Sequence, residues 1–307
     1  MAPVKLLAVF VLLYAPDAHA WGLQTHLFFA QYALAAVPFA DAELRAAAAR
    51  LPRLVLAGAC LPDLAIIGRF FLRTPAFCRS HLWATLRRIA ACPRHDHDRA
   101  LALGYATHLV SDVVAHNEFV PEHEARIGEA AMIAHLVSEW AMDSYLAPEL
   151  QPGAALEEAG WHAVEFVARA FRCSETFARR AIHTLMKADR LLRASPAPRL
   201  CRAAVRRMDR RWAARFDLYA GKTVIELSKL ETALAGGFED WSGLDPEGGS
   251  RDNGADRRTR EHIARVMQAE YDARGGGDQR ERNEEHGELR IVAAGDQRER
   301  HRMKRVA

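Results

Sequence analysis

Three potential metal-binding side chains recur at intervals of four residues within the apolar stretch 104–117. They are His108, Asp112 and His116. On an α-helix, four residues advance about 40° around the axis and about 6 Å along it, so the three side chains form one stripe. The outer two imidazoles then lie about 12 Å apart, which is too far for one metal ion. The spacing therefore predicts a site for several metal ions, with Asp112 bridging between neighbours.

A second apolar stretch carries His135 and Glu139, again four residues apart. A single histidine on an apolar helix face is usually a hydrogen-bonded core residue. A buried charge without a partner is costly, however, and a cation coordinated by both helices removes that cost. The combined set therefore favours metal ligation over packing alone.

The N-terminus has the pattern of a secretory signal peptide. Lys5 precedes a short apolar run, residues 6–14, and Ala18-His19-Ala20 fits an A-x-A cleavage site. We therefore expect residues 1–20 to be removed, so that the mature chain begins at Trp21 and is secreted or periplasmic. No later apolar run is long enough to predict a transmembrane segment in the mature chain.

The C-terminal part, residues 243–307, differs in composition from the rest of the chain. It is rich in Gly, Asp, Arg and Glu, and it repeats Gly-Asp-Gln-Arg-Glu-Arg at 277–282 and 295–300. Few apolar residues are present to offset the entropy of ordering, so we predict a disordered tail. The formal net charge of the whole chain, +3, neither requires nor excludes a nucleic-acid partner.

The body, residues 21–242, has apolar residues mainly three or four positions apart and lacks the alternation typical of strands. These features predict one all-α, multi-helix domain. The predicted helices span residues 23–36, 41–51, 80–91, 99–117, 127–145, 156–171, 174–193 and 198–235, with a break in the last near Gly221.

Polar residues and cysteines mark several expected helix ends. Asp98 is the expected N-cap of the helix that carries His108, and Asn117 and Pro121 are expected to end that helix. Of the five cysteines, Cys173 and Cys201 flank a predicted helix and are a candidate disulfide pair.

Four further residues complete a recognisable order along the chain: Trp21, His26, Asp63 after Pro62, and His81. Each alone is a weak signal, since a terminal Trp usually packs, Pro-Asp is a common turn and Ser-His a common helix start. Together with the two helical sets, they resemble the zinc-dependent phospholipase C family. That family is related to the P1/S1-type single-strand nucleases and to the catalytic domain of glycosylphosphatidylinositol-specific phospholipase D.

This resemblance implies an all-α fold, a cleft with up to three zinc ions, and ligation by the free amine and carbonyl of an N-terminal Trp. The implied ligand sets are His81, His108 and Asp112 for one ion; Trp21, His26 and bridging Asp112 for a second; and His116, His135 and Glu139 for a third. Asp63 is implied as a ligand or general base beside the first ion.

Two features depart from the family's secreted lipases and nucleases. Three residues separate Asp112 from His116, where those enzymes usually have five in a Pro-containing segment. The shorter spacing is closer to the glycosylphosphatidylinositol-specific phospholipase D branch. In addition, no β-sandwich domain follows the helical body.

Three functions are compatible with these residues. The first is a phospholipase C-like phosphodiesterase that acts on phospholipids and makes transient contact with a membrane surface. There, zinc lowers the pKa of water and Asp63 orients the nucleophile. The second is a P1/S1-type nuclease, which requires aromatic platforms for bases and a cationic track for the backbone. Arg69, Arg73 and Arg79 could supply the charge, but no interleaved pattern of basic and aromatic residues is present. The third is a noncatalytic, zinc-stabilised helical binding domain, which has no need for a poised carboxylate such as Asp63.

Overall fold

The computed structural model describes residues 22–74, 76–91, 93–127, 131–146, 149–239 and 246, without the side chains of 69, 70 and 124–138. The predicted signal peptide, Trp21 and all but one residue of the predicted tail lie outside this part. All regular elements in the described residues are helices, which confirms the all-α prediction. No helix in the described ranges is long and apolar enough to cross a membrane.

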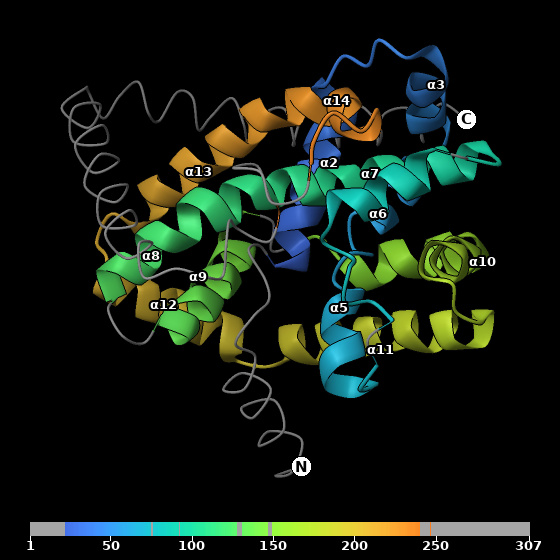
Figure 1. Cartoon of the computed structure of the whole chain (residues 1–307). Coiled ribbons are helices and arrows are strands. Elements are labelled where there is room, and N and C mark those ends of the chain that lie inside the picture. The colour runs from blue at the N-terminus through green and yellow to red at the C-terminus, as the bar shows by residue number, and fades with distance from the viewer. Residues whose placement is uncertain are drawn as a thin grey trace, which may run out of the picture. The chain divides into compact units, whose positions relative to one another are not determined.

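The chain folds into a bundle of α-helices with short π and 3₁₀ turns (Figure 1). The elements are α2 (Leu23–Ala36), α3 (Ala42–Arg50), α4 (Pro52–Gly58), α5 (Leu64–Ile66), the π-helix η1 (Ile67–Phe71), α6 (Trp83–Ala90), α7 (Asp96–Val114), the π-helix η2 (Ala115–Phe119), α8 (Val120–Ile127), α9 (Ala131–Leu146), α10 (Pro152–Phe171), α11 (Glu175–Ala194), α12 (Ala197–Met208), α13 (Trp212–Glu226), the 3₁₀-helix η3 (Leu227–Lys229) and α14 (Leu230–Leu234).

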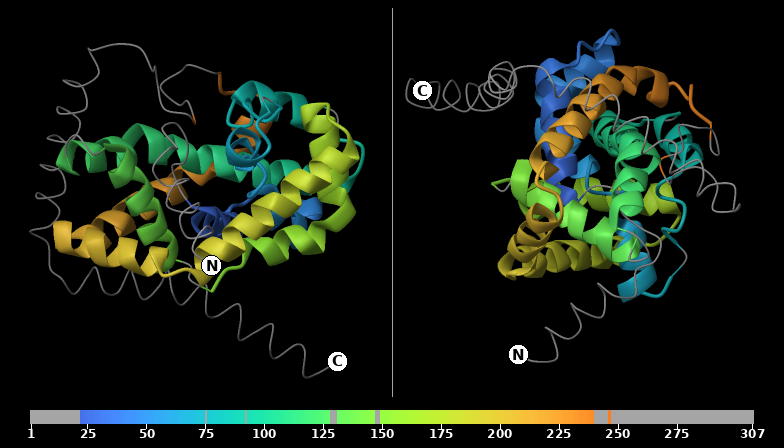
Figure 2. Two further views of the ribbon diagram at one scale, coloured as in Figure 1. Left: turned by 90° about the horizontal axis from the view of Figure 1, so that it is seen from below. Right: turned by 90° about the vertical axis from the view of Figure 1, so that its left-hand side faces the viewer.

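Helix α7 occupies the middle of this bundle. It packs against α13 and α14 on one side and against α4 and α10 on the other (Figures 1 and 2). Nearly all of its residues from Asp98 onward are buried, because neighbours surround it. The helix predicted to carry His108 and Asp112 is therefore the central element of the fold.

Two glycines allow α7 to cross α4 with their backbones in contact. A Cβ atom at Gly104 would lie 1.8 Å from the carbonyl oxygen of Val55, and one at Gly58 would lie 2.2 Å from that of Leu101. Neither distance is sterically possible, so the crossing requires glycine at both positions. The close approach places the turn after α4, which leads to Asp63, directly against α7.

Both ends of α7 differ from the sequence prediction. The N-cap is His95 rather than Asp98, which lies in the first turn and whose carboxylate accepts the Arg94 N–H at 2.8 Å. At the other end, Asn117 and Pro121 do not stop the helix. The backbone widens into η2 and continues as α8, where Pro121 is tolerated in the first turn.

Two predictions for the C-terminal helices are wrong. The break in residues 198–235 comes at Asp209, whose carboxylate accepts the Arg211 N–H at 2.9 Å, whereas Gly221 lies inside α13. This local hydrogen bond competes with the helical one and turns the chain. Cys173 and Cys201 are both free thiols in the structure, so the candidate disulfide does not form.

A buried polar network joins α8 to α13. Arg215 donates to Glu122 through Nη1 at 2.8 Å and also pairs with Asp209, and the Tyr219 hydroxyl donates to Glu122. His123 lies beside these groups, with Nδ1 3.1 Å from the Phe119 carbonyl oxygen. Burial lowers the pKa of His123 to about 4, against the opposing effects of that carbonyl and of Glu122.

This lowered pKa predicts a defined pH dependence of stability. Between pH 6.5 and about 4 the unfolded chain binds a proton at His123 that the folded chain does not. The free energy of unfolding should therefore fall as the pH drops through that window, by about 3 kcal/mol. The His123→Phe variant should lack this pH-dependent loss of stability. The difference in the free energy of unfolding between the variant and the unaltered protein, measured by urea titration, should therefore change with pH. A constant difference from pH 7.5 to 4.5 would contradict the prediction.

Candidate metal centre

Five of the predicted ligands come together in the interior although they lie on four separate segments. His26 comes from α2, Asp63 from the turn after α4, His81 from the turn before α6, and His108 and Asp112 from α7. All five side chains are buried. Two sets have donor atoms within 4.8 Å of one another, namely His81, His108 and Asp112, and His26, Asp63 and His108.

The distances in this cluster suit a shared cation. His108 Nε2 lies 3.1 Å from His81 Nε2, 3.0 Å from Asp112 Oδ2 and 4.0 Å from Asp63 Oδ1. His81 Nε2 lies 3.6 Å from Asp112 Oδ2 and 3.7 Å from Asp63 Oδ1. Ligand atoms around a tetrahedral zinc ion lie about 3.3 Å apart, given zinc–nitrogen bonds of about 2.0 Å. His81, His108 and Asp112 therefore fit one zinc ion, and Asp63 lies beside them.

Hydrogen bonds to the backbone and to two serines orient all three imidazoles. His108 Nδ1 donates to the Ala59 carbonyl at 2.8 Å. Ser80 Oγ donates to the Pro62 carbonyl at 2.6 Å and so accepts from His81 Nδ1 at 3.2 Å.

His26 follows the same rule, because Ser111 Oγ donates to the His108 carbonyl at 2.8 Å and accepts from His26 Nδ1 at 3.0 Å. In each case the tautomer directs the Nε2 lone pair at the cluster, as outer-shell partners of metal-binding histidines do.

Asp112 presents its two carboxylate oxygens to different histidines. Oδ1 lies 3.4 Å from His26 Nε2, whereas Oδ2 faces His108 and His81. The rings of His26 and His108 stack with centroids 3.5 Å apart. Because its two oxygens face different histidines, Asp112 can contact two cations, one through each oxygen.

The site attracts positive charge. Burial opposes a charge on His108, but the carboxylates of Asp112 and Asp63 raise the pKa of this imidazole. In the absence of a metal, a proton on His108 would partly neutralise the negative charge of the two carboxylates. Metal binding must displace that proton, so metal affinity should weaken as the pH falls.

The remaining predicted ligands are placed less completely. Glu139, on α9, is buried, and its burial together with the nearby charges of Asp63 and Asp112 raises its pKa well above the usual range. His116 lies half-buried on the π-helix η2, and it belongs to neither of the two donor sets found among the described residues. The side chain of His135 and all of Trp21 lie outside the described residues, so the predicted third set is only partly visible.

One functional contact near the predicted N-terminal ligand had no signal in the sequence. Helix α2 has no cap of its own, and the buried carboxylate of Asp143, from α9, accepts hydrogen bonds from the Thr25 N–H at 2.9 Å and the Thr25 hydroxyl at 2.7 Å. A Cβ at Gly22 would lie 2.1 Å from Asp143 Oδ2, so a larger residue there would displace the Asp143 carboxylate. Asp143 thus fixes the first turn of the helix that carries His26.

We expect Asp143→Ala to destabilise the fold by about 2–4 kcal/mol, because it leaves two buried donors of Thr25 without an acceptor. Asp143→Asn keeps one acceptor oxygen and should cost less. Urea unfolding of both variants tests this order. Equal stabilities of the Ala variant and the unaltered protein would show that α2 is anchored in another way.

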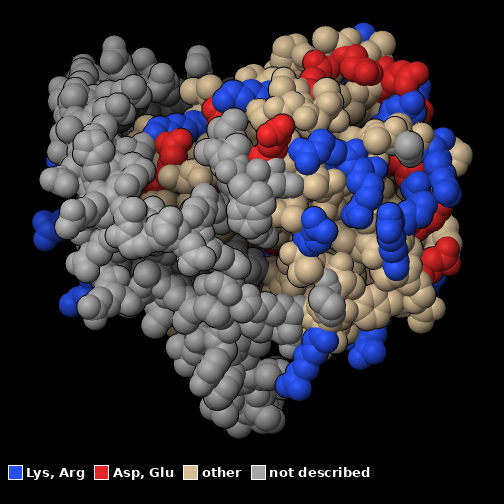
Figure 3. Space-filling model, in the orientation of Figure 1, with Lys and Arg blue, Asp and Glu red and all other residues tan. Residues whose placement is uncertain are grey.

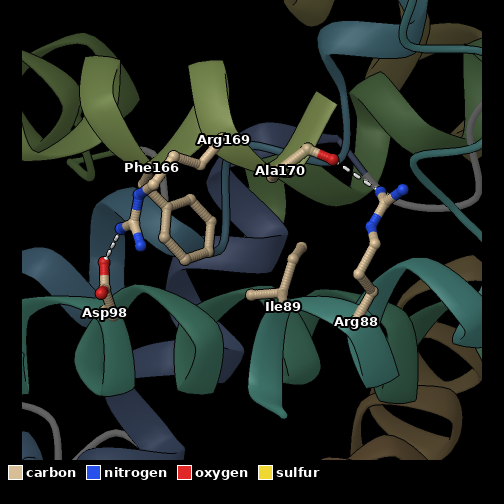
Figure 4. Close-up of a pocket in the computed structure, with 6 residues that line it drawn as sticks. All are labelled: Arg88, Ile89, Asp98, Phe166, Arg169 and Ala170. Atoms are coloured by element: carbon tan, nitrogen blue, oxygen red, sulfur yellow. Dashed lines mark hydrogen bonds and ion pairs between the residues drawn. The ribbon is translucent and has the colours of Figure 1, made fainter. Parts of the chain in front are cut away.

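A small cavity of about 80 Å³ elsewhere in the bundle is not part of this centre (Figure 4). It lies between α6, the start of α7 and α10, and both of its arginines form contacts with neighbouring residues. Arg169 pairs with Asp98, and Arg88 donates to the Ala170 carbonyl at 2.6 Å. Figure 4 shows both contacts, which leave the cavity without an evident ligand-binding role.

Comparison with known proteins adds a family assignment to this geometry. The family model described as zinc dependent phospholipase C matches residues 25–190, more than half of the chain and including all five clustered side chains. No curated protein and no solved structure matches the chain. Because this match covers more than half of the chain, the chain belongs to the zinc-dependent phospholipase C family.

Proposed function

We propose that this protein hydrolyses phosphodiester bonds of phospholipids at a multinuclear zinc centre. The observation that carries the proposal is the position of Asp112 in a buried site, where Oδ1 faces His26 and Oδ2 faces His81 and His108. Membership of a zinc-dependent phospholipase C family supports both the metal and the substrate class.

The clustered residues have distinct roles in this proposal. His81, His108 and Asp112 hold one zinc ion, and His26 and Asp112 hold a second together with the amine and carbonyl of Trp21. We assign a third ion to His116, His135 and Glu139. Export and cleavage after Ala20 would expose the amine of Trp21, which makes the protein secreted or periplasmic in this proposal.

Zinc bound at this centre supplies Lewis-acid stabilisation of charge on phosphate oxygens and activation of the attacking water. The protein side chains then position the reaction. Asp63 Oδ1 lies 3.7 Å from His81 Nε2 and 4.0 Å from His108 Nε2, at the edge of the first ligand set. We assign this carboxylate to orient the attacking water and accept its proton.

The test compares substrates and metal states. Mature protein, purified without chelator, is assayed on phosphatidylcholine and on single-stranded DNA before and after dialysis against a strong chelator. We expect chelator-sensitive hydrolysis of the lipid and lower helical stability after metal removal, because buried carboxylates would lose their counter-charge. Hydrolysis of DNA alone would favour a nuclease, and absence of bound metal with indifference to added zinc would refute the centre.

A further inference from the structure

Positive charge is concentrated in one segment of the chain. Residues 187–211 contain nine Lys or Arg and two Asp, whereas the rest of 22–239 contains eighteen Lys or Arg and twenty-one Asp or Glu. The segment comprises the end of α11, all of α12 and the turn before α13. Helix α12 begins after residue 190, where the match to the family model ends.

Both acidic residues of this segment are already engaged. Asp189 pairs with Arg193 at 2.6 Å, and Asp209 pairs with Arg215. Arg199, Arg206 and Arg207 on α12 are exposed, and within the described part of the chain they form no ion pair.

Basic residues on α3 and at the start of α7 are arranged differently. Along the upper right of Figure 3, Lys and Arg lie beside Asp and Glu. In that region α3 and α7 are joined by the pairs Arg50–Asp96 and Arg99–Glu43. The charge on α12 is therefore less compensated than the charge on α3 and at the start of α7.

Helix α12 also exposes apolar surface. It lies at the edge of the bundle (Figure 2) and packs on α9 with one narrow face, where Val205 is its only buried residue. Leu200, Ala204 and Met208, spaced four residues apart, form an exposed stripe, with 64% of Leu200 and 54% of Met208 accessible. Arginines beside an exposed apolar stripe are typical of helices that lie in a membrane interface.

We propose that α12 is the surface by which this protein binds an anionic phospholipid bilayer. This inference rests on the proposed lipid-hydrolysing function and specifies how the enzyme reaches its substrate. The guanidinium groups meet lipid phosphates while Leu200 and Met208 enter the headgroup region. The Arg202 Nη1 donates to the Ser144 carbonyl at 3.1 Å, which ties the docked helix to α9.

Other partners fit this surface less well. Single-stranded nucleic acid is bound through aromatic platforms, and residues 187–211 contain no Phe, Tyr or Trp. A second copy of this chain would bring like charges together across a shared α12 interface. A bilayer with anionic headgroups complements both the charge and the apolar stripe.

The experiment measures vesicle binding separately from hydrolysis. Metal-loaded mature protein is sedimented with vesicles of phosphatidylcholine alone or mixed with phosphatidylglycerol, at low and high salt. We expect binding to the mixed vesicles that weakens with salt. The triple variant Arg199→Glu, Arg206→Glu, Arg207→Glu should bind at least about a hundredfold more weakly, since each basic residue near an anionic surface contributes about 1 kcal/mol.

Two further variants separate this site from net charge and misfolding. Arg94→Glu, Arg172→Glu, Arg180→Glu makes the same change in charge on other elements and should retain vesicle binding. Leu200→Gln with Met208→Gln keeps the charge and should weaken binding several-fold. Unaltered binding by the α12 variants, or equal loss in the control, would overturn the proposal, as would α12-dependent binding to single-stranded DNA without binding to vesicles.

Hydrolysis of a soluble, monomeric phosphocholine ester tests the proposed function separately from the proposed membrane-binding role of α12. The α12 variants should hydrolyse it at the unaltered rate, because the zinc centre is unchanged. A protein that hydrolyses this ester but does not bind anionic vesicles retains its function and refutes the docking surface. A protein that binds vesicles through α12 but hydrolyses no phosphodiester refutes the function instead.

Discussion

Replacing Asp112 by Asn should lower the rate of phosphodiester hydrolysis by at least about a hundredfold. The amide is nearly the same size, so the packing of α7 is preserved, but it loses the negative charge that faces two sets of histidines. Asp112 Oδ1 lies 3.4 Å from His26 Nε2, and Oδ2 lies 3.0 Å from His108 Nε2. This one substitution should therefore lower the affinity of the protein for two zinc ions.

The measurement combines turnover with metal analysis of the same preparation. Glu139→Gln is the matched comparison, because it also neutralises a buried carboxylate but is assigned to a single ion, and its effect should be smaller. Asp112→Asn protein with near-normal turnover and full zinc content would show that this carboxylate does not bridge.

Adding one Ala before Trp21 should remove one zinc ion and reduce hydrolysis by a factor on the order of a hundred. The proposed chelate uses the free amine of Trp21, and an amide nitrogen cannot replace it because its lone pair is delocalised into the peptide bond. The described residues begin at Gly22, directly after Trp21. Gly22 lies four residues before His26 and against Asp143. The carboxylate of Asp143 accepts a hydrogen bond from the first turn of α2, which carries His26.

The matched control starts at residue 21 with Phe in place of Trp. It keeps the amine and the carbonyl, so it should retain zinc and much of the activity. Mass spectrometry establishes each N-terminus, and metal analysis and turnover are then compared. Equal zinc content and rates with and without the added Ala would exclude the N-terminal chelate, whatever the roles of His108 and Asp112.

The all-α class could be predicted because it depends on local spacing. Apolar residues recur every three or four positions, and the predicted helix 23–36 has the same bounds as α2. The metal-binding character was also visible locally, since His108 and Asp112 share one helix face and meet at 3.0 Å. Residues four apart on a helix are neighbours whatever the rest of the chain does.

Local exceptions to helical geometry were not predictable. The π turn η2 (Ala115–Phe119) begins directly after α7 and includes His116, where the sequence predicted a continuous α-helix. Asp209 ends a helix that its neighbours would continue, because its side chain competes for a backbone N–H.

The sequence by itself determined which residue types were available for metal binding, and in what order, because ligand chemistry belongs to the side chains. Only the tertiary structure decided which of them meet. The glycine contacts at Gly58 and Gly104 bring the turn before Asp63 onto α7. Ser80 donates to the Pro62 carbonyl, and Ser111 orients His26. These contacts join positions far apart in the chain, and no local pattern encodes them, since they depend on how closely helices pack.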